Sequence, residues 1–114
     1  AAVGPYSQAI EVNGFVFCSG QLPIDPATGV FAEGGVKEQT RQSILNAQEV
    51  LRSAGLELSN VAKTTVYLSD MDNFAAMNEV YAQFFSEPFP ARSAVAVKTL
   101  PKNALVEVEC IATR

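Results

Sequence analysis

Asn13-Gly14 lies between two strand-like runs and is the strongest local fold signal in the sequence. Residues 7–12 show an alternating pattern of polar and apolar side chains, and residues 15–20 begin with Phe-Val-Phe. An Asn-Gly pair between two such runs favours a tight turn whose twist matches that of paired antiparallel strands. The chain is therefore predicted to start with a β-hairpin.

The pattern changes from strand to helix after turn residues at 25–29. From Thr40 to Ala54, apolar or small side chains recur at steps of three and four, which is typical of an amphipathic helix. This helix is predicted to begin at Val36 and to end at Gly55, because glycine accepts the backbone conformation that terminates helices.

A second helix is predicted to begin at a cap formed by Asp72 or Asn73 and to end before Pro88 and Pro90. Its apolar stripe is interpreted as core packing, with an aromatic binding platform as the alternative; the stripe consists of Phe74, Met77, Tyr81 and Phe84. Strands are predicted, from their β-branched and apolar content, at 61–68, 93–100 and 104–112.

The predicted order is ββαβαββ in one domain of residues 1–114, an α+β fold with one mixed sheet. Right-handed crossovers place both helices on one face of the sheet. The last two strands are joined by a short turn at 101–103 and are expected to pair as an antiparallel hairpin. Residues 15–20 and the run from Ser93 are apolar on both faces, so the face without helices needs another cover. A second copy of the chain is the simplest cover, and the pattern predicts a closed homo-oligomer.

The absence of histidine from the 114 residues limits the chemistry that the chain can perform. It removes Ser-His and Cys-His nucleophile arrangements, imidazole acid–base catalysis and the usual imidazole metal ligands. The two cysteines, Cys18 and Cys110, fall within strand-like runs and are interpreted as reduced core thiols, with a disulfide as the alternative. Neither a metal nor a cofactor is expected.

The charge balance disfavours nucleic acid as a partner. Eight basic residues stand against 12 acidic ones, the net charge is −4, and there is no basic run. Binding to a phosphate backbone needs clustered Lys and Arg. No apolar run is long enough to span a bilayer, so no membrane partner is expected. We expect a cytoplasmic protein; because the first residue is not Met, an organelle stays open if a leader was removed.

Arg92 and Glu107 are the main candidates for chemistry. Arg92 stands at the start of an apolar strand, where its planar guanidinium suits the bidentate capture of a carboxylate; the alternative is an ordinary surface arginine. Glu107 and Glu109 are two residues apart, so they point to the same face of the last strand, opposite to the face expected under the helices. The alternative is a solvated, charged strand face. If the last two strands pair, Arg92 and one of these glutamates can share a site.

Four weaker candidates accompany them. Tyr6 begins a strand-like run, and Asn78 lies on the second predicted helix. Ser19 and Gly20 end the second strand-like run, where a glycine lets a ligand approach the backbone closely. Taken singly, each is also explained by packing, by chain turning or by a surface amide.

Five motifs run through the chain in order: GPYSQAI, SGQLPIDPATG, KTTVYLSDM, FPARSAVAV and VEVECIA. Together they resemble the YjgF/Rid family, the reactive intermediate deaminases that act on enamines and imines, over essentially all 114 residues. The resemblance implies a chorismate-mutase-like fold and a homotrimer with a site in each cleft between subunits. The implied substrates are 2-imino acids formed from enamines such as 2-aminoacrylate, and the implied products are 2-keto acids and ammonia.

The same resemblance implies roles for individual residues. Arg92 matches the arginine that pairs with the substrate carboxylate, and Glu107 matches the glutamate associated with the attacking water. Ala94 stands where many members have a cysteine; because that position acts mainly through its backbone in the family, activity is expected to persist. The segment before Arg92 is also a little shorter than in well-known bacterial members, which can change the shape of the cleft. The positions that match cleft-lining residues are Tyr6, Ser19, Gly20, Asn78 and Ala94.

Two alternative functions stay open beside the deaminase. One is a non-catalytic protein that binds or senses a small keto or amino acid, for which tight binding without turnover would be the sign. The other is a translation-inhibiting ribonuclease, which the acidic composition and the lack of histidine disfavour. The intact arginine and glutamate pair favours the deaminase.

Overall fold

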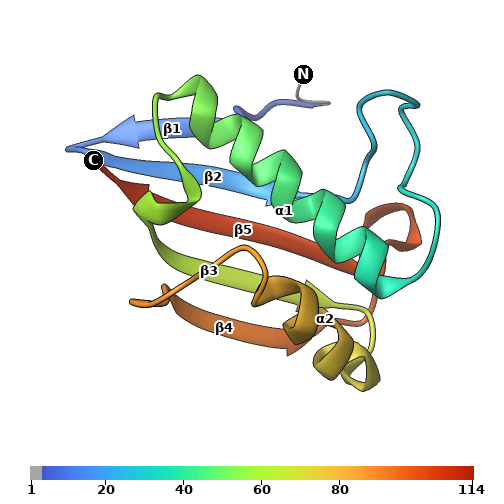
Figure 1. Cartoon of the computed structure of the whole chain (residues 1–114). Coiled ribbons are helices and arrows are strands. Elements are labelled where there is room, and N and C mark those ends of the chain that lie inside the picture. Colours follow the sequence, from blue (N-terminus) through green and yellow to red (C-terminus); the bar gives the residue numbers. More distant parts are fainter. Residues whose placement is uncertain (1–3) are drawn as a thin grey trace.

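The chain follows the predicted ββαβαββ order in the computed structural model, which describes residues 4–114 (Figure 1). The five strands form one mixed sheet in the order β1-β2-β5-β3-β4. The strands are β1 (Ala9–Val12), β2 (Phe15–Gln21), β3 (Val61–Leu68), β4 (Ala91–Ala96) and β5 (Val106–Thr113), and the helices are α1 (Val36–Ser53) and α2 (Phe74–Tyr81). Three short 3₁₀ turns are η1 (Leu58–Asn60), η2 (Met71–Asn73) and η3 (Pro101–Asn103).

The predicted hairpin and both predicted helices are confirmed. Asn13 and Gly14 have φ values of 51° and 81°, the positive angles that this kind of tight turn needs, and β1 pairs antiparallel with β2. Helix α1 begins at Val36, and Gly55 follows its end with a φ of 79°. Asn73 stands at the N-cap of α2, but its side chain makes no capping hydrogen bond. The capping side chain lies one turn earlier, where Asp70 before η2 accepts a hydrogen bond from the Asp72 backbone.

The predicted hairpin between the last two strands is wrong. Strand β5 lies between β2 and β3 and is antiparallel to both, whereas β4 is an edge strand that pairs only with β3, in parallel. The connection after β4 is longer than a tight turn, because β4 ends at Ala96 and η3 carries the chain across the end of the sheet. Burial explains the order: side chains of β5 alternate between buried and half-buried, as in a central strand, while no side chain of β4 is fully buried.

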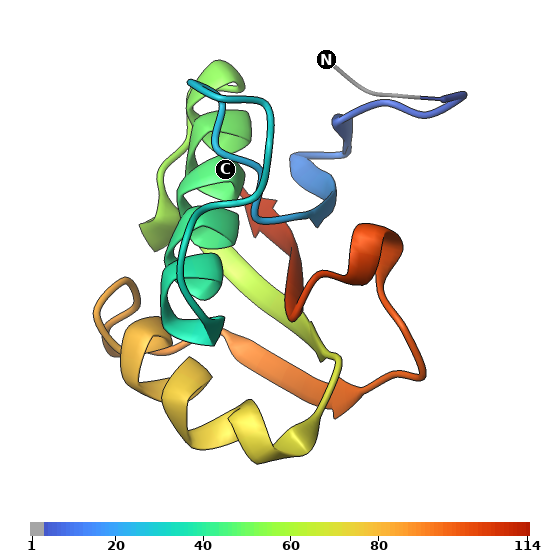
Figure 2. The same cartoon turned by 90° about the vertical axis from the view of Figure 1, so that its right-hand side faces the viewer.

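Both helices cover the same face of the sheet, as predicted (Figure 2). Valines from β3 and β5 pack there against Ile44 and Leu51 of α1 and Met77 of α2, all fully buried. The apolar stripe of α2 belongs to this core, which supports the packing interpretation. The two cysteines are free and buried, and Cys18 lies directly opposite Cys110 in the β2–β5 pair. No helix within residues 4–114 is long and apolar enough to cross a bilayer.

The other face of the sheet carries the exposed apolar side chains that the sequence predicted. Ile10 lies opposite Phe17, and Val12 lies opposite Phe15, so these four side chains form one patch at the β1–β2 end. Between 45% and 53% of each of them is exposed. Figure 2 shows the N-terminal segment and the η3 loop on this side of the sheet. We call it the open face.

A substitution in α1 tests how tightly the core is satisfied. The Ser43 hydroxyl is completely buried and has no hydrogen-bond partner among residues 4–114. Ser43→Ala removes an unsatisfied polar group and adds helix propensity, so it is expected to raise the free energy of unfolding by about 1 kcal/mol. Chemical denaturation measures the change, with Ser53→Ala at the exposed end of α1 as the matched control. A fall in stability for Ser43→Ala would show that the hydroxyl has a partner in solution.

Candidate functional site

Arg92 is held on the helix-covered face by three side chains of α2. It is half-buried, and its Nη1 donates a hydrogen bond of 2.6 Å to Oδ1 of Asn78. Its guanidinium carbon lies 4.8 Å from the ring centroid of Tyr81 and 5.5 Å from that of Phe74. The Tyr81 hydroxyl is fixed in turn by a buried hydrogen bond of 2.8 Å to Thr64. The α2 stripe therefore packs the core and also supports the arginine.

The charge of Arg92 is not neutralised by this arrangement. No carboxylate within residues 4–114 forms an ion pair with it, and an amide oxygen occupies only one of the five N–H donors of a guanidinium. A small pocket of about 370 Å³ opens beside it, lined by Asn78, Tyr81, Ala82, Phe89 and Pro90. A positioned, half-buried guanidinium with free donors suits a small carboxylate.

Glu107 lies half-buried on the open face, in strand β5. Burial, and then the charge of Glu109, raise the pKa of the Glu107 carboxyl. Gly20 of the neighbouring strand makes room for it, since a Cβ at this position would lie 2.6 Å from Oε2 of Glu107. No hydrogen bond to the Glu107 side chain forms within the described part of the chain. A carboxyl with a raised pKa and a free oxygen is suited to accept a proton.

A β-bulge shapes the backbone next to Glu107. Cys18 lies opposite Cys110, but Gln21 lies opposite Val108, so Ser19 and Gly20 together face a single position of β5. The side chain of Gln21 donates hydrogen bonds to the Ser19 carbonyl (3.1 Å) and to Oε1 of Gln8 (2.9 Å). The bulge is therefore tied to the segment before β1.

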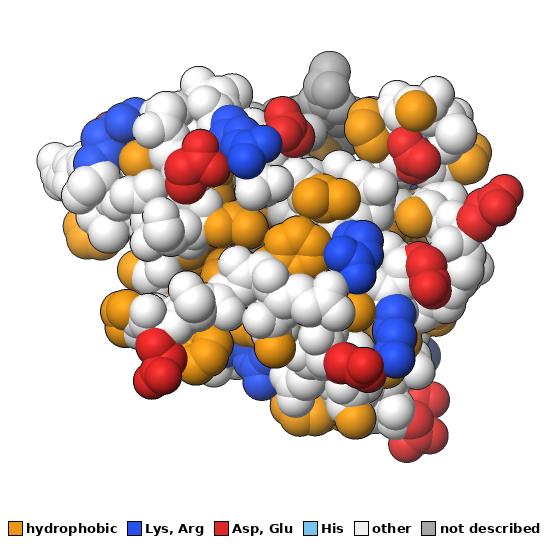
Figure 3. Space-filling model, in the orientation of Figure 1, with side chains coloured by type: hydrophobic (Ala, Val, Ile, Leu, Met, Phe, Trp, Pro, Cys, Tyr) orange, Lys and Arg blue, Asp and Glu red, His pale blue; other side chains and the backbone are white. Residues whose placement is uncertain are grey.

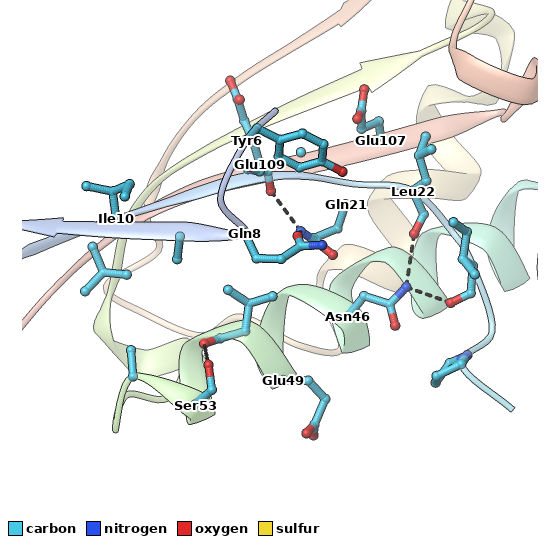
Figure 4. A pocket seen from close by; sticks show the side chains of 18 of the residues that line it. Tyr6, Gln8, Ile10, Gln21, Leu22, Asn46, Glu49, Ser53, Glu107 and Glu109 are labelled. Carbon is cyan, nitrogen blue, oxygen red and sulfur yellow. Dashed lines mark hydrogen bonds between the residues drawn. The ribbon is translucent and has the colours of Figure 1, made fainter. Parts of the chain in front are cut away.

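The N-terminal segment places Tyr6 over this part of the open face. The Ser19 hydroxyl donates to the carbonyl of Ser7 at 2.6 Å, next to Tyr6, whose side chain is half exposed. Tyr6, Ser19, Gly20 and Glu107 line one broad, open groove of about 1470 Å³. Figure 4 shows Tyr6, Glu107 and Glu109 on one side of the strands, away from the α1 side chains that line the groove's other end.

The predicted site residues thus form two groups on opposite faces of the sheet. Arg92, Asn78 and the half-buried Ala94 belong to the helix-covered face, and Tyr6, Ser19, Gly20 and Glu107 belong to the open face. We call them the arginine half-site and the glutamate half-site.

The expectation that Arg92 and a glutamate share a site within one chain is wrong, and the sheet register gives the reason. Arg92 lies opposite Thr64 of β3, whereas Glu107 lies opposite Tyr67. Thr64 and Tyr67 are an odd number of residues apart on β3, so their side chains point to opposite faces of the sheet. Arg92 and Glu107, which lie opposite them, therefore also point to opposite faces. One chain cannot bring the two half-sites together.

Two features near the site were not anticipated from the sequence. Tyr67 donates a hydrogen bond of 2.8 Å to Oε1 of Glu109, beside Glu107. Phe89 is 57% exposed and lines the pocket of Arg92. The alternating pattern of β3 indicates the face to which Tyr67 points, but it does not indicate which strand lies beside β3. The contact with Glu109 could therefore not be predicted from the sequence.

The helix-covered face offers little to a polyanion. On the face that carries the helices, acidic and basic side chains are interspersed and no single-sign patch forms (Figure 3). Within residues 4–114, no group of His, Cys, Asp and Glu side chains is arranged to hold a metal ion. The geometry therefore favours a small anionic ligand.

Comparison with known proteins gives matches over nearly the whole chain. The sequence profile of the family described as Endoribonuclease L-PSP matches residues 1–114. A RutC family protein of Pyrococcus horikoshii is 54% identical over 110 residues, which cover 96% of this chain and 87% of the relative. The 2-iminobutanoate/2-iminopropanoate deaminase of Capra hircus is 48% identical over 114 residues, which cover 100% of this chain and 83% of the relative.

A solved structure agrees in fold. The crystal structure of E. coli TdcF with bound serine matches with a TM-score of 0.93 at 42% identity, over 99% of this chain and 91% of that one. The similarity thus extends to the whole fold and is not confined to one motif.

Proposed function

Because this chain belongs to the Endoribonuclease L-PSP family, the YjgF/Rid family of the sequence motifs, we propose that it hydrolyses small 2-imino acids to 2-keto acids and ammonia. The observation that carries the proposal is the free charge of Arg92. Its guanidinium is positioned by Asn78 and two aromatic rings but is paired with no carboxylate in residues 4–114. A substrate carboxylate supplies the missing partner. Relatives named 2-iminobutanoate/2-iminopropanoate deaminase support the same reaction class.

The complete site is proposed to form between copies of the chain. The arginine half-site and the glutamate half-site face in opposite directions within one copy, and the open face carries an exposed apolar patch. A neighbouring copy that covers this patch can bring its arginine half-site to the glutamate half-site. A homotrimer, which the family resemblance implies, closes such head-to-tail contacts into a ring.

The proposed reaction needs little catalytic power, because imines already hydrolyse in water. Arg92 binds the substrate carboxylate through two parallel hydrogen bonds and so fixes the position of the imine carbon. Glu107 accepts a proton from water as the oxygen attacks that carbon, and the raised pKa of its carboxyl favours this role. The proton that Glu107 accepted is passed to the imine nitrogen, which gives a neutral carbinolamine. Transfer of the carbinolamine hydroxyl proton to nitrogen then breaks the C–N bond, forms the keto C=O and releases ammonia. Tyr6, Ser19, Gly20 and the backbone at Ala94 are proposed to line the cleft.

The alternatives have separate signatures. A binding or sensing protein would use the same guanidinium without turnover, and a relative crystallised with bound serine is consistent with capture of a small amino acid. A ribonuclease, which the family description names, would need acid–base groups and a phosphate-binding surface. The chain has no histidine and a net charge of −4, so we do not favour this reaction.

A coupled assay tests the proposed function. An amino-acid oxidase or a serine dehydratase generates imines in place, and the loss of imine and the release of keto acid are followed with and without the protein. Imine loss is expected to accelerate in proportion to the amount of protein added. An unchanged rate with imines of several side-chain sizes would contradict the proposal and favour the binding protein; RNA cleavage in a parallel incubation would favour the ribonuclease.

A further inference from the structure

Glu107 and Glu109 point to the same face of β5 but have different surroundings. Glu109 accepts a hydrogen bond of 2.8 Å from the hydroxyl of Tyr67. Glu107 receives no hydrogen bond within residues 4–114 and packs against Gly20. Two carboxylates in unlike environments are the usual arrangement when one must stay charged while the other takes up a proton.

The position of Tyr67 in the sheet connects the two glutamates. Tyr67 is directly opposite Glu107 in the β3–β5 pair, while Thr65 is opposite Glu109. Directly opposite side chains on an antiparallel pair lie in contact range, and diagonal neighbours are within reach of an aromatic side chain. Tyr67 therefore stands beside Glu107 but directs its hydroxyl along the strand to Glu109. The phenol is not available to Glu107.

We propose that Tyr67 and Glu109 are positioning residues for Glu107: Tyr67 holds the Glu109 carboxylate in place as a fixed negative neighbour, so that Glu107 is the carboxylate that accepts the proton from water. This inference rests on the proposed deamination. It assigns Tyr67 and Glu109 no contact with the substrate, and both act through Glu107.

The electrostatics agree with this geometry. Burial raises the pKa of the Glu107 carboxyl, and the charge of Glu109 raises it further. The hydrogen bond to Glu109 raises the pKa of the Tyr67 phenol, so the phenol keeps its proton and remains a donor at neutral pH. A carboxylate with a higher pKa is the stronger proton acceptor, provided that it is still ionised at the working pH.

Other charged or titratable groups line the same groove as Glu107 within the described chain. Tyr6 comes from the N-terminal segment, Lys102 is an exposed residue of η3, and Glu11 and Glu49 come from β1 and α1. Lys63 lies on β3 four residues before Tyr67, opposite Ile111. A neighbouring copy of the chain places the same charged groups near Glu107 in the wild type and in each variant. The decisive quantity is therefore the difference in the Glu107 pKa between the wild type and a variant, and not its absolute value.

The test is a titration of the Glu107 carboxyl carbon by NMR in the intact oligomer, together with the pH dependence of kcat/KM. Activity is expected to rise with pH as Glu107 loses its proton. Glu109→Gln removes the neighbouring charge, so the Glu107 midpoint and the acid limb of kcat/KM are both expected to move to lower pH. Tyr67→Phe releases the Glu109 carboxylate and is expected to move both in the same direction by less. In the Glu109→Gln background, Tyr67→Phe is expected to have no further effect.

The control is Glu33→Gln, which makes the same change in net charge at an exposed loop position and is expected to leave the Glu107 midpoint in place. Unchanged midpoints in both Glu109→Gln and Tyr67→Phe would overturn the inference, as would an equal effect of Tyr67→Phe with and without Glu109. If the wild-type protein hydrolysed no imine, the proposed function would fail. If the titration midpoint of Glu107 still moved in the Glu109→Gln and Tyr67→Phe variants, Tyr67 and Glu109 would control the protonation of Glu107 for a different reaction.

Discussion

Replacing Arg92 with alanine is expected to lower kcat/KM for imine hydrolysis by about 1,000-fold, because the substrate carboxylate loses its charged, two-pronged partner. Arg92→Lys keeps the charge but loses the planar fork, and a loss of about 100-fold is expected. The side chain is only half-buried, so the free energy of unfolding is expected to fall by about 1 kcal/mol through lost contacts with Asn78 and Tyr81. The coupled assay and chemical denaturation measure the two effects.

Arg41 provides a matched control for this substitution. Its guanidinium donates to the side-chain amide of Gln83 at 2.8 Å and lies 5.7 Å from the ring centroid of Phe84, so it has the same kinds of contact away from both half-sites. Arg41→Ala is expected to leave kcat/KM within about twofold of wild type. Full activity in Arg92→Lys would show that the arginine is not a bidentate anchor, and equal losses in Arg41→Ala and Arg92→Ala would point to a general effect on folding.

Mixing two inactive variants is expected to restore activity, which is the second large effect. Arg92→Ala destroys the arginine half-site and Glu107→Gln destroys the glutamate half-site. If each site combines half-sites from two copies, a random mixture of the variants regenerates an intact pair at about a quarter of the contacts in a closed ring. Co-expression with two affinity tags selects the mixed oligomers and removes the homo-oligomers. In a trimeric ring each mixed oligomer has one intact pair among its three contacts, so the coupled assay on doubly tagged oligomers is expected to show about a third of the wild-type rate.

A mixture of Arg92→Ala with Arg92→Lys is the control, because both changes damage the same half-site and cannot complement each other. Mixed oligomers of Arg92→Ala and Glu107→Gln that remain inactive would contradict a site shared between copies. Size-exclusion chromatography with light scattering on the same samples reports whether the oligomer is a trimer, independently of activity.

Much of the fold could be predicted because its signals are local. The Asn13-Gly14 turn, the spacing of apolar residues in α1 and the Gly55 stop each depend on a few neighbouring residues, and all three are present in the structure. The alternation in β5 also correctly placed Glu107 and Glu109 on the face opposite the core.

The partner of each strand could not be predicted in the same way. Strand β5 pairs with β2 and β3, which are more than 35 residues distant, and the short turn predicted at 101–103 suggested the wrong neighbour. That error concealed the separation of Arg92 from Glu107, since the face to which Arg92 points depends on its register with Thr64.

The candidate site shows the same limit at the scale of single residues. The family motifs predicted roles for Arg92, Glu107 and the cleft positions, but each motif is a local string and does not state which residues meet. The bulge at Ser19-Gly20 adds one residue to β2 relative to β5, and alternation along β2 alone does not reveal it. The diagonal contact of Tyr67 with Glu109 requires the register of two strands and was found only in the structure.

The odd spacing between Thr64 and Tyr67 on β3 has a consequence for how such a protein would behave as its abundance changes. With its two half-sites turned away from each other, a newly made chain would be inert until it met other copies. Specific activity would then depend on concentration, falling on dilution below the dissociation constant of the assembly. The same spacing would keep a stray monomer inactive, because its proposed carboxylate anchor and its proposed base lie on opposite faces of one sheet.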